Sequence, residues 1–469
     1  MVVAIVCAGC GGATSSWTQP NASVDGTRSA AHAKIDSSSV SRLHVAWRFR
    51  IPIQPRESGV ATSTPLIANG VVYYQDMESN VYALRLDTGL VVWRRLFHAG
   101  NPGPNGLSLD GGRVFGSTDT TVFCLDAKTG RVEWTHRILG KLESFVDIAP
   151  LATGGLVYTA TTGYGPGTRG AIYALDQRTG AIRWRFDTIR GPWRFPVEAG
   201  GGGAWQTPTL AGGTLYVGTA NPIPWGGSPQ HPNGGAYPGR ALWTDSLLAL
   251  DAKTGRLRWS DQVTPHDIRD HDFQNPPLLA DGLIVGSGKG GRVVAWNAKT
   301  RRRAWSTSVG LHRNDTGALP DRSVSVCPGL LGGVETPAAA AGGRVFVPVV
   351  DLCYRENATG GAAQSFLRVD PAHGRGSLVA LSLSTGRRLW SRALRQPPFG
   401  CATVSNDVVL TSSYGGSLFA FRTDDGRSLW RTQTPARINA CPAVAAGRLV
   451  VAAGVPRGHA ALELLAYSL

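Results

Sequence analysis

The sequence predicts an all-β fold, an eight-bladed β-propeller, from three observations. A unit made of a β-run, a turn of the Asp-x-x-Thr-Gly kind and a tryptophan occurs seven times in 469 residues. The units recur with a period of about 40 to 50 residues, and their apolar runs alternate with glycine turns, as in propeller blades. The first and last segments of the chain together supply an eighth copy. The tryptophans of the seven complete copies are Trp93, Trp134, Trp184, Trp259, Trp305, Trp390 and Trp430.

Each copy reads as four short strands. In the first copy the apolar runs are Thr64–Ala68, Val71–Gln75, Val81–Leu84 and Val91–Arg94, and Asn, Gly and Asp separate them. In the last turn of each copy the Asp or Ser side chain can accept hydrogen bonds from turn amides, while Gly adopts a positive φ. Arg301 replaces this glycine in the fifth copy. We therefore expect the fifth turn to differ from the others.

A small residue stands before each turn, which indicates limited space between neighbouring sheets. The residues at this position are Ala83, Cys124, Ala174, Ala249, Ala295, Ala380 and Ala420. The tryptophan on the outer strand supplies the large apolar area that joins one blade to the next. Cys124 is accordingly expected to be an inert thiol of the core.

The two ends of the chain are expected to build one blade together. Ile438–Leu469 contains three strand-like runs but no tryptophan strand, and His44–Phe49 contains Trp47. Pairing these segments closes the ring and leaves no open sheet edge between its ends. The sequence therefore predicts one propeller domain over residues 17–469, with seven blades as the alternative.

Residues 1–10, which end in Ala-Gly-Cys, resemble a bacterial lipoprotein signal, although no basic residue precedes the apolar stretch. The resemblance implies cleavage before Cys10 and acylation of its thiol, with residues 11–16 as a flexible tether. A redox or metal pair formed by Cys7 and Cys10 is the alternative. No other stretch is long and apolar enough to span a bilayer. We therefore expect an exported protein that is secreted or meets the membrane through a lipid anchor only.

The remaining four cysteines of the propeller are candidates for two disulfides. Cys327 with Cys353, and Cys401 with Cys441, lie in successive blades, and an oxidising compartment would permit both bonds. Four cysteines allow three arrangements, so this pairing is one of the possibilities.

The net charge of +15 comes mostly from arginines scattered through turns and blade ends. Scattered charge favours only weak association with acidic envelope polymers or a membrane surface. No nucleic-acid-binding motif accompanies the charge, so we expect no nucleic-acid partner.

The fourth copy carries a distinctive insertion. It begins at Asn221-Pro-Ile-Pro-Trp225 and ends at Leu242–Asp251, and the loop after Trp259 contains Asp270-His-Asp272. An ordinary scaffold propeller needs neither feature. Over nearly its whole length the chain resembles the pyrroloquinoline quinone (PQQ) dependent alcohol dehydrogenases, which are eight-bladed quinoproteins.

This resemblance implies a role for five residues. Trp205 would be the floor on which the cofactor stacks, and Lys289 a cation beside the quinone oxygens. Asn221 and Asp270 would be metal ligands, and Asp270 also the base that takes the alcohol proton. Asp272 matches the extra carboxylate of family members that use a lanthanide ion in place of calcium, because added negative charge favours a more highly charged cation.

The chain also departs from the family. The stretch Thr161–Gly170 has no metal-binding glutamate, Asn105 stands where an arginine is expected, and Thr62 stands where a glutamate is expected. The vicinal cysteine pair of many members is missing. Glu335 is a candidate replacement for the lost ligand. No Cys-x-x-Cys-His motif occurs, which excludes a fused c-type haem in this sequence and implies an external electron acceptor.

Each site residue has a plainer interpretation. Asn221 would cap the turn before Pro222, Asp270 and Asp272 would belong to a solvated acidic loop, and Lys289 would be exposed in a glycine-rich turn. His266 and His271 on the same loop are only a weak signal for a transition metal.

Two functions therefore remain open. One is a PQQ-dependent oxidoreductase that acts on a small or polymeric alcohol. The other is a non-catalytic propeller lipoprotein, similar to the scaffold of outer-membrane β-barrel assembly. The insertion and the acidic loop favour the enzyme, whereas the missing glutamate and arginine favour the scaffold, and the fold alone cannot separate them.

Overall fold

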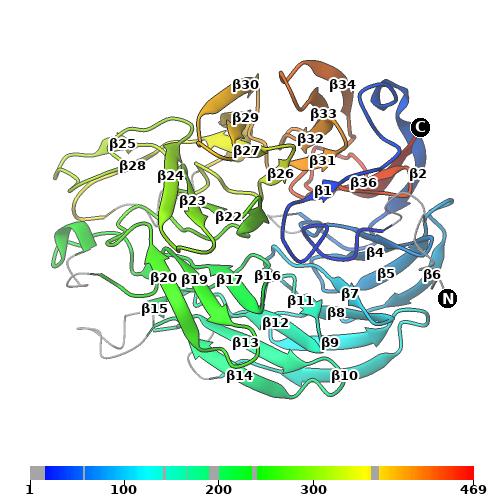
Figure 1. Cartoon of the computed structure of the whole chain (residues 1–469), viewed down its shortest axis with the longest axis horizontal. Helices are drawn as coiled ribbons and strands as arrows, with labels where there is room; N and C mark the ends of the chain where they lie inside the picture. The colour runs from blue at the N-terminus through cyan, green and yellow to red at the C-terminus, as the bar shows by residue number, and fades with distance from the viewer. Residues whose placement is uncertain are drawn as a thin grey trace, which may run out of the picture.

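A computed structural model describes residues 16–55, 59–140, 144–165, 167–189, 200–234, 240–360 and 369–469. Eight sheets are arranged around one axis (Figure 1), so the eight-bladed prediction is confirmed and the seven-bladed alternative is wrong. The predicted signal (residues 1–10), its acceptor Cys10 and most of the predicted tether lie outside the described residues. No helix in the described part of the chain is long and apolar enough to cross a membrane.

Each blade runs from an inner strand near the axis to an outer strand at the rim. Blade 1 contains β3 (Leu66–Ala68), β4 (Val71–Gln75), β5 (Val81–Arg85) and β6 (Val91–Arg95), and blade 2 contains β7 (Ser108–Asp110), β8 (Arg113–Ser117), β9 (Thr121–Asp126) and β10 (Val132–Arg137). Blade 3 contains β11 (Leu151–Thr153), β12 (Leu156–Ala160), β13 (Ala171–Asp176) and β14 (Ile182–Asp187), and blade 4 contains β16 (Thr209–Ala211), β17 (Thr214–Gly218), β19 (Ser246–Asp251) and β20 (Leu257–Gln262). Blade 5 contains β21 (Leu278–Ala280), β22 (Leu283–Ser287), β23 (Arg292–Asn297) and β24 (Arg303–Ser308), and blade 6 contains β26 (Ala339–Ala341), β27 (Arg344–Asp351), β29 (Arg375–Ser382) and β30 (Arg388–Leu394). Blade 7 contains β31 (Thr403–Ser405), β32 (Val408–Ser412), β33 (Ser417–Arg422) and β34 (Ser428–Gln433), with β1 (Ser29–Ala30) beside β31. Blade 8 contains β35 (Ala443–Ala445), β36 (Arg448–Ala453), β37 (Glu463–Ser468) and β2 (His44–Arg50).

The remaining elements lie outside the blades. They are two small ribbons, β15 (Gly200–Gly201) with β18 (Pro222–Ile223) and β25 (Val324–Val326) with β28 (Tyr354–Glu356), and three 3-10 turns, η1 (Val40–Arg42), η2 (Pro232–Gly234) and η3 (Pro371–His373).

The ring closes through its first and last strands, as the sequence predicts. β2 pairs antiparallel with β37, from His44 opposite Ser468 to Arg50 opposite Glu463. Trp47 on β2 donates a hydrogen bond from Nε1 to the carbonyl of Leu86 in blade 1 at 2.9 Å. The eighth blade therefore contacts the first in the same way as the other blades contact their neighbours.

The repeated tryptophan joins the blades by a bond and a stacking contact. Trp134, for example, donates from Nε1 to the carbonyl of Gln177 in the next blade at 2.9 Å. Its ring also lies against Gly180, where an added Cβ would come within 2.6 Å of the ring. The turn glycine therefore has two tasks, a positive φ and room for the neighbouring indole. The other tryptophans that bond in this way are Trp47, Trp93, Trp184, Trp305 and Trp390.

The expectation that Arg301 changes its turn is wrong for the backbone. Arg301 adopts φ 62°, and its amide bonds the carbonyl of Asn297 at 2.8 Å, as the glycine turns do. The difference lies in the packing. In the glycine turns the docked indole leaves no room for a Cβ, whereas Arg301 has one. Trp259, the repeated tryptophan of the preceding blade, makes a tilted contact with the ring of Trp296 at 6.4 Å between centroids.

Replacing Gly180 with alanine is expected to destabilise the protein by about 2–4 kcal/mol, because Ala meets both the left-handed backbone and the ring of Trp134. Gly70 is the matched control, since it has φ 75° and open space where an added Cβ would lie. Gly70→Ala should therefore cost only about 1 kcal/mol. Urea unfolding measures both, and equal losses would contradict the docking role of Gly180.

The segment Trp17–Ala30 closes one end of the axis. It bonds the inner strand, or the residue before it, in every blade. The contacts are Trp17 with Ile67, Thr18 with Leu109, Gln19 with Ala152, Val24 with Leu210, Asp25 with Leu279, Thr27 with Ala340, Arg28 with Val404 and Arg28 with Pro442. Trp17 and Arg28 are fully buried in this arrangement. A ligand on the axis therefore has to enter from the opposite end.

The structure pairs the cysteines in the predicted way. Cys327 bonds Cys353 with 4.6 Å between their Cα atoms, and Cys401 bonds Cys441 with 5.2 Å. Cys124 is buried as a free thiol, and burial raises its pKa to about 12. Its thiolate is therefore absent at neutral pH, which agrees with an inert core residue.

Candidate functional site

Loops from two adjacent blades meet at the open end of the axis. Asn221 follows β17, Asp270 and Asp272 lie between β20 and β21, and Lys289 lies between β22 and β23. Trp205 stands just before the inner strand of blade 4. The fold thus collects all five residues that the family resemblance singled out.

Lys289 is the centre of this group. Its Nζ lies 3.0 Å from Asp270 Oδ2 and 2.7 Å from Asp272 Oδ2, and 4.7 Å from the ring centroid of Trp205. The other oxygen of Asp272, Oδ1, accepts a hydrogen bond from the backbone amide of Asn221 at 2.6 Å. The side chain of Lys289 is only 4% exposed, so this is a buried ion-paired cluster and not a solvated loop.

Glycines allow these loops to approach each other. The carbonyl of Asp272 accepts from the amide of Lys289 at 2.9 Å, and a Cβ on Gly288 would lie 2.0 Å from that oxygen. A Cβ on Gly333, in the next blade, would lie 1.9 Å from the carbonyl of Lys289. Any larger residue at Gly288 or Gly333 would push the Lys289 loop away from the carboxylates.

The acidic loop is held in a fixed shape. Asp267 accepts hydrogen bonds from the amides of Arg269 at 2.7 Å and His271 at 2.6 Å. The guanidinium of Arg269 donates to the carbonyls of Asn314 at 2.6 Å and Gly317 at 2.7 Å. These bonds hold Asp270 between them at φ 61°, a strained conformation for a non-glycine residue.

Among the side chains with a buried polar atom that has no partner, four share one position in consecutive blades. Asp147, Trp205, Gln274 and Glu335 each lie four residues before the inner strand of blades 3, 4, 5 and 6. Their unpaired atoms, within the described part of the chain, are Asp147 Oδ1, Trp205 Nε1, Gln274 Oε1 and Nε2, and Glu335 Oε2. Buried polar groups normally have partners, so four such groups on consecutive blades indicate a polar ligand on the axis.

Three carboxyl groups, those of Asp270, Asp272 and Glu335, face the single ammonium of Lys289. Burial raises the pKa of Asp270 well above its usual value, although Lys289 opposes this shift. Burial acts to lower the pKa of Lys289, but Asp270, Asp272 and Glu335 outweigh it and hold that pKa well above its usual value. Burial also raises the pKa of Glu335 to about 8. These directions indicate a site that would be stabilised by an additional cation.

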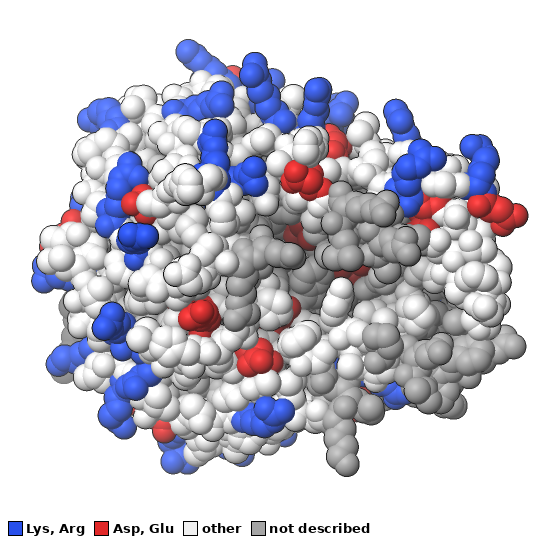
Figure 2. Space-filling model, turned by 180° about the vertical axis from the view of Figure 1, so that it is seen from behind, with Lys and Arg blue, Asp and Glu red and all other residues white. Residues whose placement is uncertain are grey.

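The space-filling view from the back of Figure 1 shows how charge is distributed over this face. Lys and Arg side chains stand mostly toward the rim, and Asp and Glu side chains appear both at the rim and around the central part (Figure 2).

Glu335→Gln is expected to change how stability depends on pH in the cofactor-free protein. A carboxyl whose folded pKa is about 8 binds its proton more tightly than in the unfolded chain. The wild type should therefore lose stability as pH rises from about 4.5 to 8. The variant should lack this loss and be more stable by about 4 kcal/mol at pH 8. Thermal unfolding across this pH range measures the difference, and parallel curves would contradict a buried Glu335.

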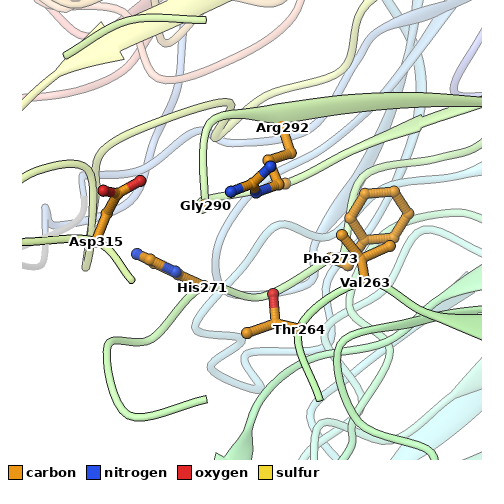
Figure 3. Close-up of a pocket in the computed structure, with 8 residues that line it drawn as sticks. Val263, Thr264, His271, Phe273, Gly290, Arg292 and Asp315 are labelled. Carbon is orange, nitrogen blue, oxygen red and sulfur yellow. The ribbon is translucent and has the colours of Figure 1, made fainter. Parts of the chain in front are cut away.

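The two histidines of the loop do not form a metal pair. His266 Nε2 lies 3.1 Å from the carbonyl of Asn233, and His271 Nε2 lies 3.0 Å from the carbonyl of Pro328. His271 lines a small cavity with Thr264, Arg292 and Asp315 (Figure 3). The loop thus presents its two carboxylates to Lys289 and the imidazole to a separate cavity.

Thr62 and Asn105, which stand where the family pattern has a glutamate and an arginine, hydrogen-bond to each other in the structure. Thr62 Oγ1 donates to Asn105 Oδ1 at 3.1 Å, and Asn105 Nδ2 donates to the carbonyl of Asp76 at 2.7 Å. These two residues therefore bond each other and the backbone. The described residues contain no group of three His, Cys, Asp or Glu side chains placed to hold one metal ion.

Sequence reasoning missed Asp147 and Gln274. Neither belongs to a motif, but both occupy the position of Trp205 and Glu335 relative to their inner strands. Aligning the copies on their inner strands, instead of on the tryptophan turn, would have found them.

Comparison with known proteins identifies the family. A quinohemoprotein alcohol dehydrogenase of Comamonas testosteroni is 25% identical over 92% of this chain and 70% of its own. A family model described as glucose/ethanol/alcohol dehydrogenase, beta-propeller domain, matches residues 17–108. A model described as outer membrane protein assembly factor BamB matches residues 77–326 and 374–466. The chain belongs to the PQQ-type propeller family described by this last model, which matches more than half of its residues, and it is similar to the quinoprotein alcohol dehydrogenases.

Two solved structures show which form of this family's fold the chain follows. A europium-containing methanol dehydrogenase superposes with a TM-score of 0.82 at 19% identity, over 97% of this chain and 98% of its own. BamB from Moraxella catarrhalis superposes with a TM-score of 0.58 at 15% identity, over 91% of this chain and 100% of its own. At these identities the likeness concerns the fold, and the fold is nearer to the dehydrogenase form than to BamB.

Proposed function

We propose that the chain is a PQQ-dependent oxidoreductase that oxidises a small or polymeric alcohol at the open end of the propeller axis. The observation that carries this proposal is the arc of unpaired buried polar atoms on blades 3 to 6, beside the ion pairs of Lys289. A propeller that served only as a scaffold would have no reason to bury such atoms without partners.

The residues present fit a polar cofactor and a hard cation. Asn221, Asp270 and Asp272 offer amide and carboxylate oxygens, the donors that calcium and lanthanide ions prefer. The unpaired Glu335 Oε2 adds a further oxygen near Lys289. In this proposal the first three hold the ion, and Trp205 is the flat surface against which the cofactor rests. When bound, PQQ supplies the two-electron acceptor for the hydride of the alcohol.

In this proposal the side chains of the cluster and its loop have separate roles in the reaction. Asp270 accepts the hydroxyl proton of the alcohol at its carboxylate. The Lys289 ammonium 3.0 Å away and a bound cation would together oppose the effect of burial on the pKa of Asp270 and favour the ionised form. With the cofactor bound, the Lys289 ammonium would supply a positive charge beside its quinone oxygens. Asp267 and Arg269 fix the loop, so that Asp270 does not turn away from the substrate.

A scaffold lipoprotein is the second candidate. The missing third-blade glutamate and the lack of a three-ligand group among the described residues support it. The buried cluster around Lys289 and the better superposition on a dehydrogenase fold weigh against it. We therefore favour the enzyme.

We further propose that the protein works outside the cytoplasm. The two disulfides fit an oxidising compartment, and acylation of Cys10 would anchor the chain to a membrane. The sequence lacks a c-type haem motif, so electrons would leave to an external acceptor.

Titration with PQQ in the presence of calcium or lanthanum is expected to show saturable binding, with lanthanum stronger because the cluster is rich in carboxylates. Trp205→Ala should weaken binding at least about tenfold by removing the stacking surface. Absorbance and tryptophan fluorescence report binding. Failure to bind with either ion would exclude the enzyme and favour the scaffold.

A further inference from the structure

The outer strand of blade 1 exposes an apolar strip. Leu90 is 65% exposed, Val91 48%, Val92 50% and Leu96 40%, and all four lie on or directly beside β6. We call these four side chains the β6 strip. The other exposed large hydrophobic residues of the described chain are spread over different loops and blades. β6 has a neighbour on one side only, so its outer edge is open.

The strip is specific to blade 1. The third residue before the repeated tryptophan is an arginine in five of the seven complete copies, and in blade 1 it is Leu90. The residue directly before the tryptophan is Glu133 in blade 2 and Arg183 in blade 3, and in blade 1 it is Val92. The five arginines are Arg131, Arg256, Arg302, Arg387 and Arg427. The repeat thus allows charge here, and blade 1 alone has three consecutive exposed alkyl side chains.

Arginines surround the strip. Arg94 is exposed on β6 itself. The neighbouring outer strands, β2 of blade 8 and β10 of blade 2, present Arg50 and Arg137 to solvent, and β2 also presents Arg48, which pairs with Glu463 at 2.9 Å. Figure 1 shows β6 at the rim of the ring with β2 and β10 on either side. Alkyl side chains bordered by cations are the pattern of surfaces that sit at an anionic lipid interface.

We propose that the β6 strip is a contact surface for an anionic lipid bilayer. The position of the bilayer follows from the proposed acylation of Cys10, on which this inference rests. Six Cα-to-Cα steps separate Cys10 from Ser16 and span at most about 20 Å. Ser16 precedes Trp17, which pairs with β3 of the same blade, and β6 lies three strand spacings away, about 14 Å. The anchor can therefore bring the rim of blade 1 to the lipid.

Self-association through β6 is the competing occupant. The edge from Leu90 to Leu96 is small compared with the roughly 1,200 Å² that stable interfaces bury. A lipid surface needs no such area from one partner, because attraction between the arginines and anionic headgroups adds to the apolar contact. Contact through the rim would also leave the open end of the axis accessible to substrate.

The test uses the full chain with Cys10→Ser, so that lipid binding is not due to acylation. The double variant Leu90→Arg, Val92→Glu gives β6 the residues that blade 2 carries at the same positions, Arg131 and Glu133. Leu389→Glu, which removes a 40% exposed leucine from blade 6, is the matched control. Vesicles of phosphatidylethanolamine with phosphatidylglycerol are the probe, and phosphatidylcholine vesicles test the need for anionic lipid.

The parent and the control should sediment with the anionic vesicles, and the double variant should bind about tenfold more weakly. Equal binding of parent and double variant, or no binding by either, would overturn the proposal. So would a parent that is dimeric by ultracentrifugation while the double variant is monomeric and neither binds vesicles. PQQ titration of the same samples, and mass spectrometry of the membrane-extracted chain for acylation of Cys10, report the proposed function and the anchor separately.

Discussion

Asp270→Asn is expected to lower kcat for alcohol oxidation by about 10³-fold, because asparagine has nearly the same shape but cannot accept the hydroxyl proton. Asp272 continues to pair with Lys289 at 2.7 Å, so the cluster should stay folded. Affinity for PQQ should change only a few-fold. A dye-linked assay on protein loaded with PQQ and lanthanum measures kcat, and the titration measures binding.

Asp272→Asn is the contrasting variant on the same loop. It removes a carboxylate from the cation site but leaves Asp270 and its ion pair with Lys289. Its main expected effect is weaker binding of lanthanum relative to calcium, with kcat of the fully loaded protein less affected. If Asp270→Asn kept wild-type turnover, or if the two variants lost kcat equally, Asp270 would not be the base.

Arg28→Met is expected to destabilise the protein by about 3–5 kcal/mol, the largest loss of stability that we predict. The Arg28 guanidinium is fully buried and donates to five acceptors. Methionine has a similar length but no donors, so these acceptors would lose a partner inside the protein. The acceptors are the carbonyls of Pro20, Ala402 and Pro442, Asn21 Oδ1 and Thr403 Oγ1.

Arg85→Met provides the control for this substitution. Arg85 pairs with Asp87 at 2.8 Å, but both side chains are more than half exposed. Exposed pairs of this kind contribute little to stability, so the control should unfold close to the wild-type denaturant midpoint. Urea unfolding followed by tryptophan fluorescence measures both variants. Similar midpoints for the two would show that Arg28 does not hold the N-terminal segment across the axis.

The architecture was predictable because its signal is repeated. Seven tryptophans at matched positions indicate the blades. Because the last copy lacks its tryptophan strand, the sequence also predicts that β2 completes this blade beside β37, as the structure shows. The contacts of Trp17–Ala30 with all eight blades were not predictable, because most of them join backbone atoms and leave no pattern in the side chains. Arg301 shows the limit of turn rules, since the neighbouring strands hold a non-glycine residue at φ 62°.

The site was predictable only where it follows motifs. The family resemblance named Trp205, Asn221, Asp270, Asp272 and Lys289, and the structure brings them together, while their chemical roles stay predictions. The local sequence could not show that Lys289 is buried between two carboxylates, because a glycine-rich turn is more often exposed. It also could not reveal Asp147 and Gln274, whose significance depends on their unpaired atoms in the folded chain.

The seam between β2 and β37 also governs the order in which the molecule can assemble. His44 finds its partner only when Ser468, almost the last residue, is available. The loop that this contact closes includes nearly the whole chain. Closing it has a large entropic cost, so we expect the contact to form late in folding. Until then the chain is an open arc with free strands at both ends, a state prone to aggregation. Chaperone protection during synthesis and transport would therefore matter most for the segment that is made first.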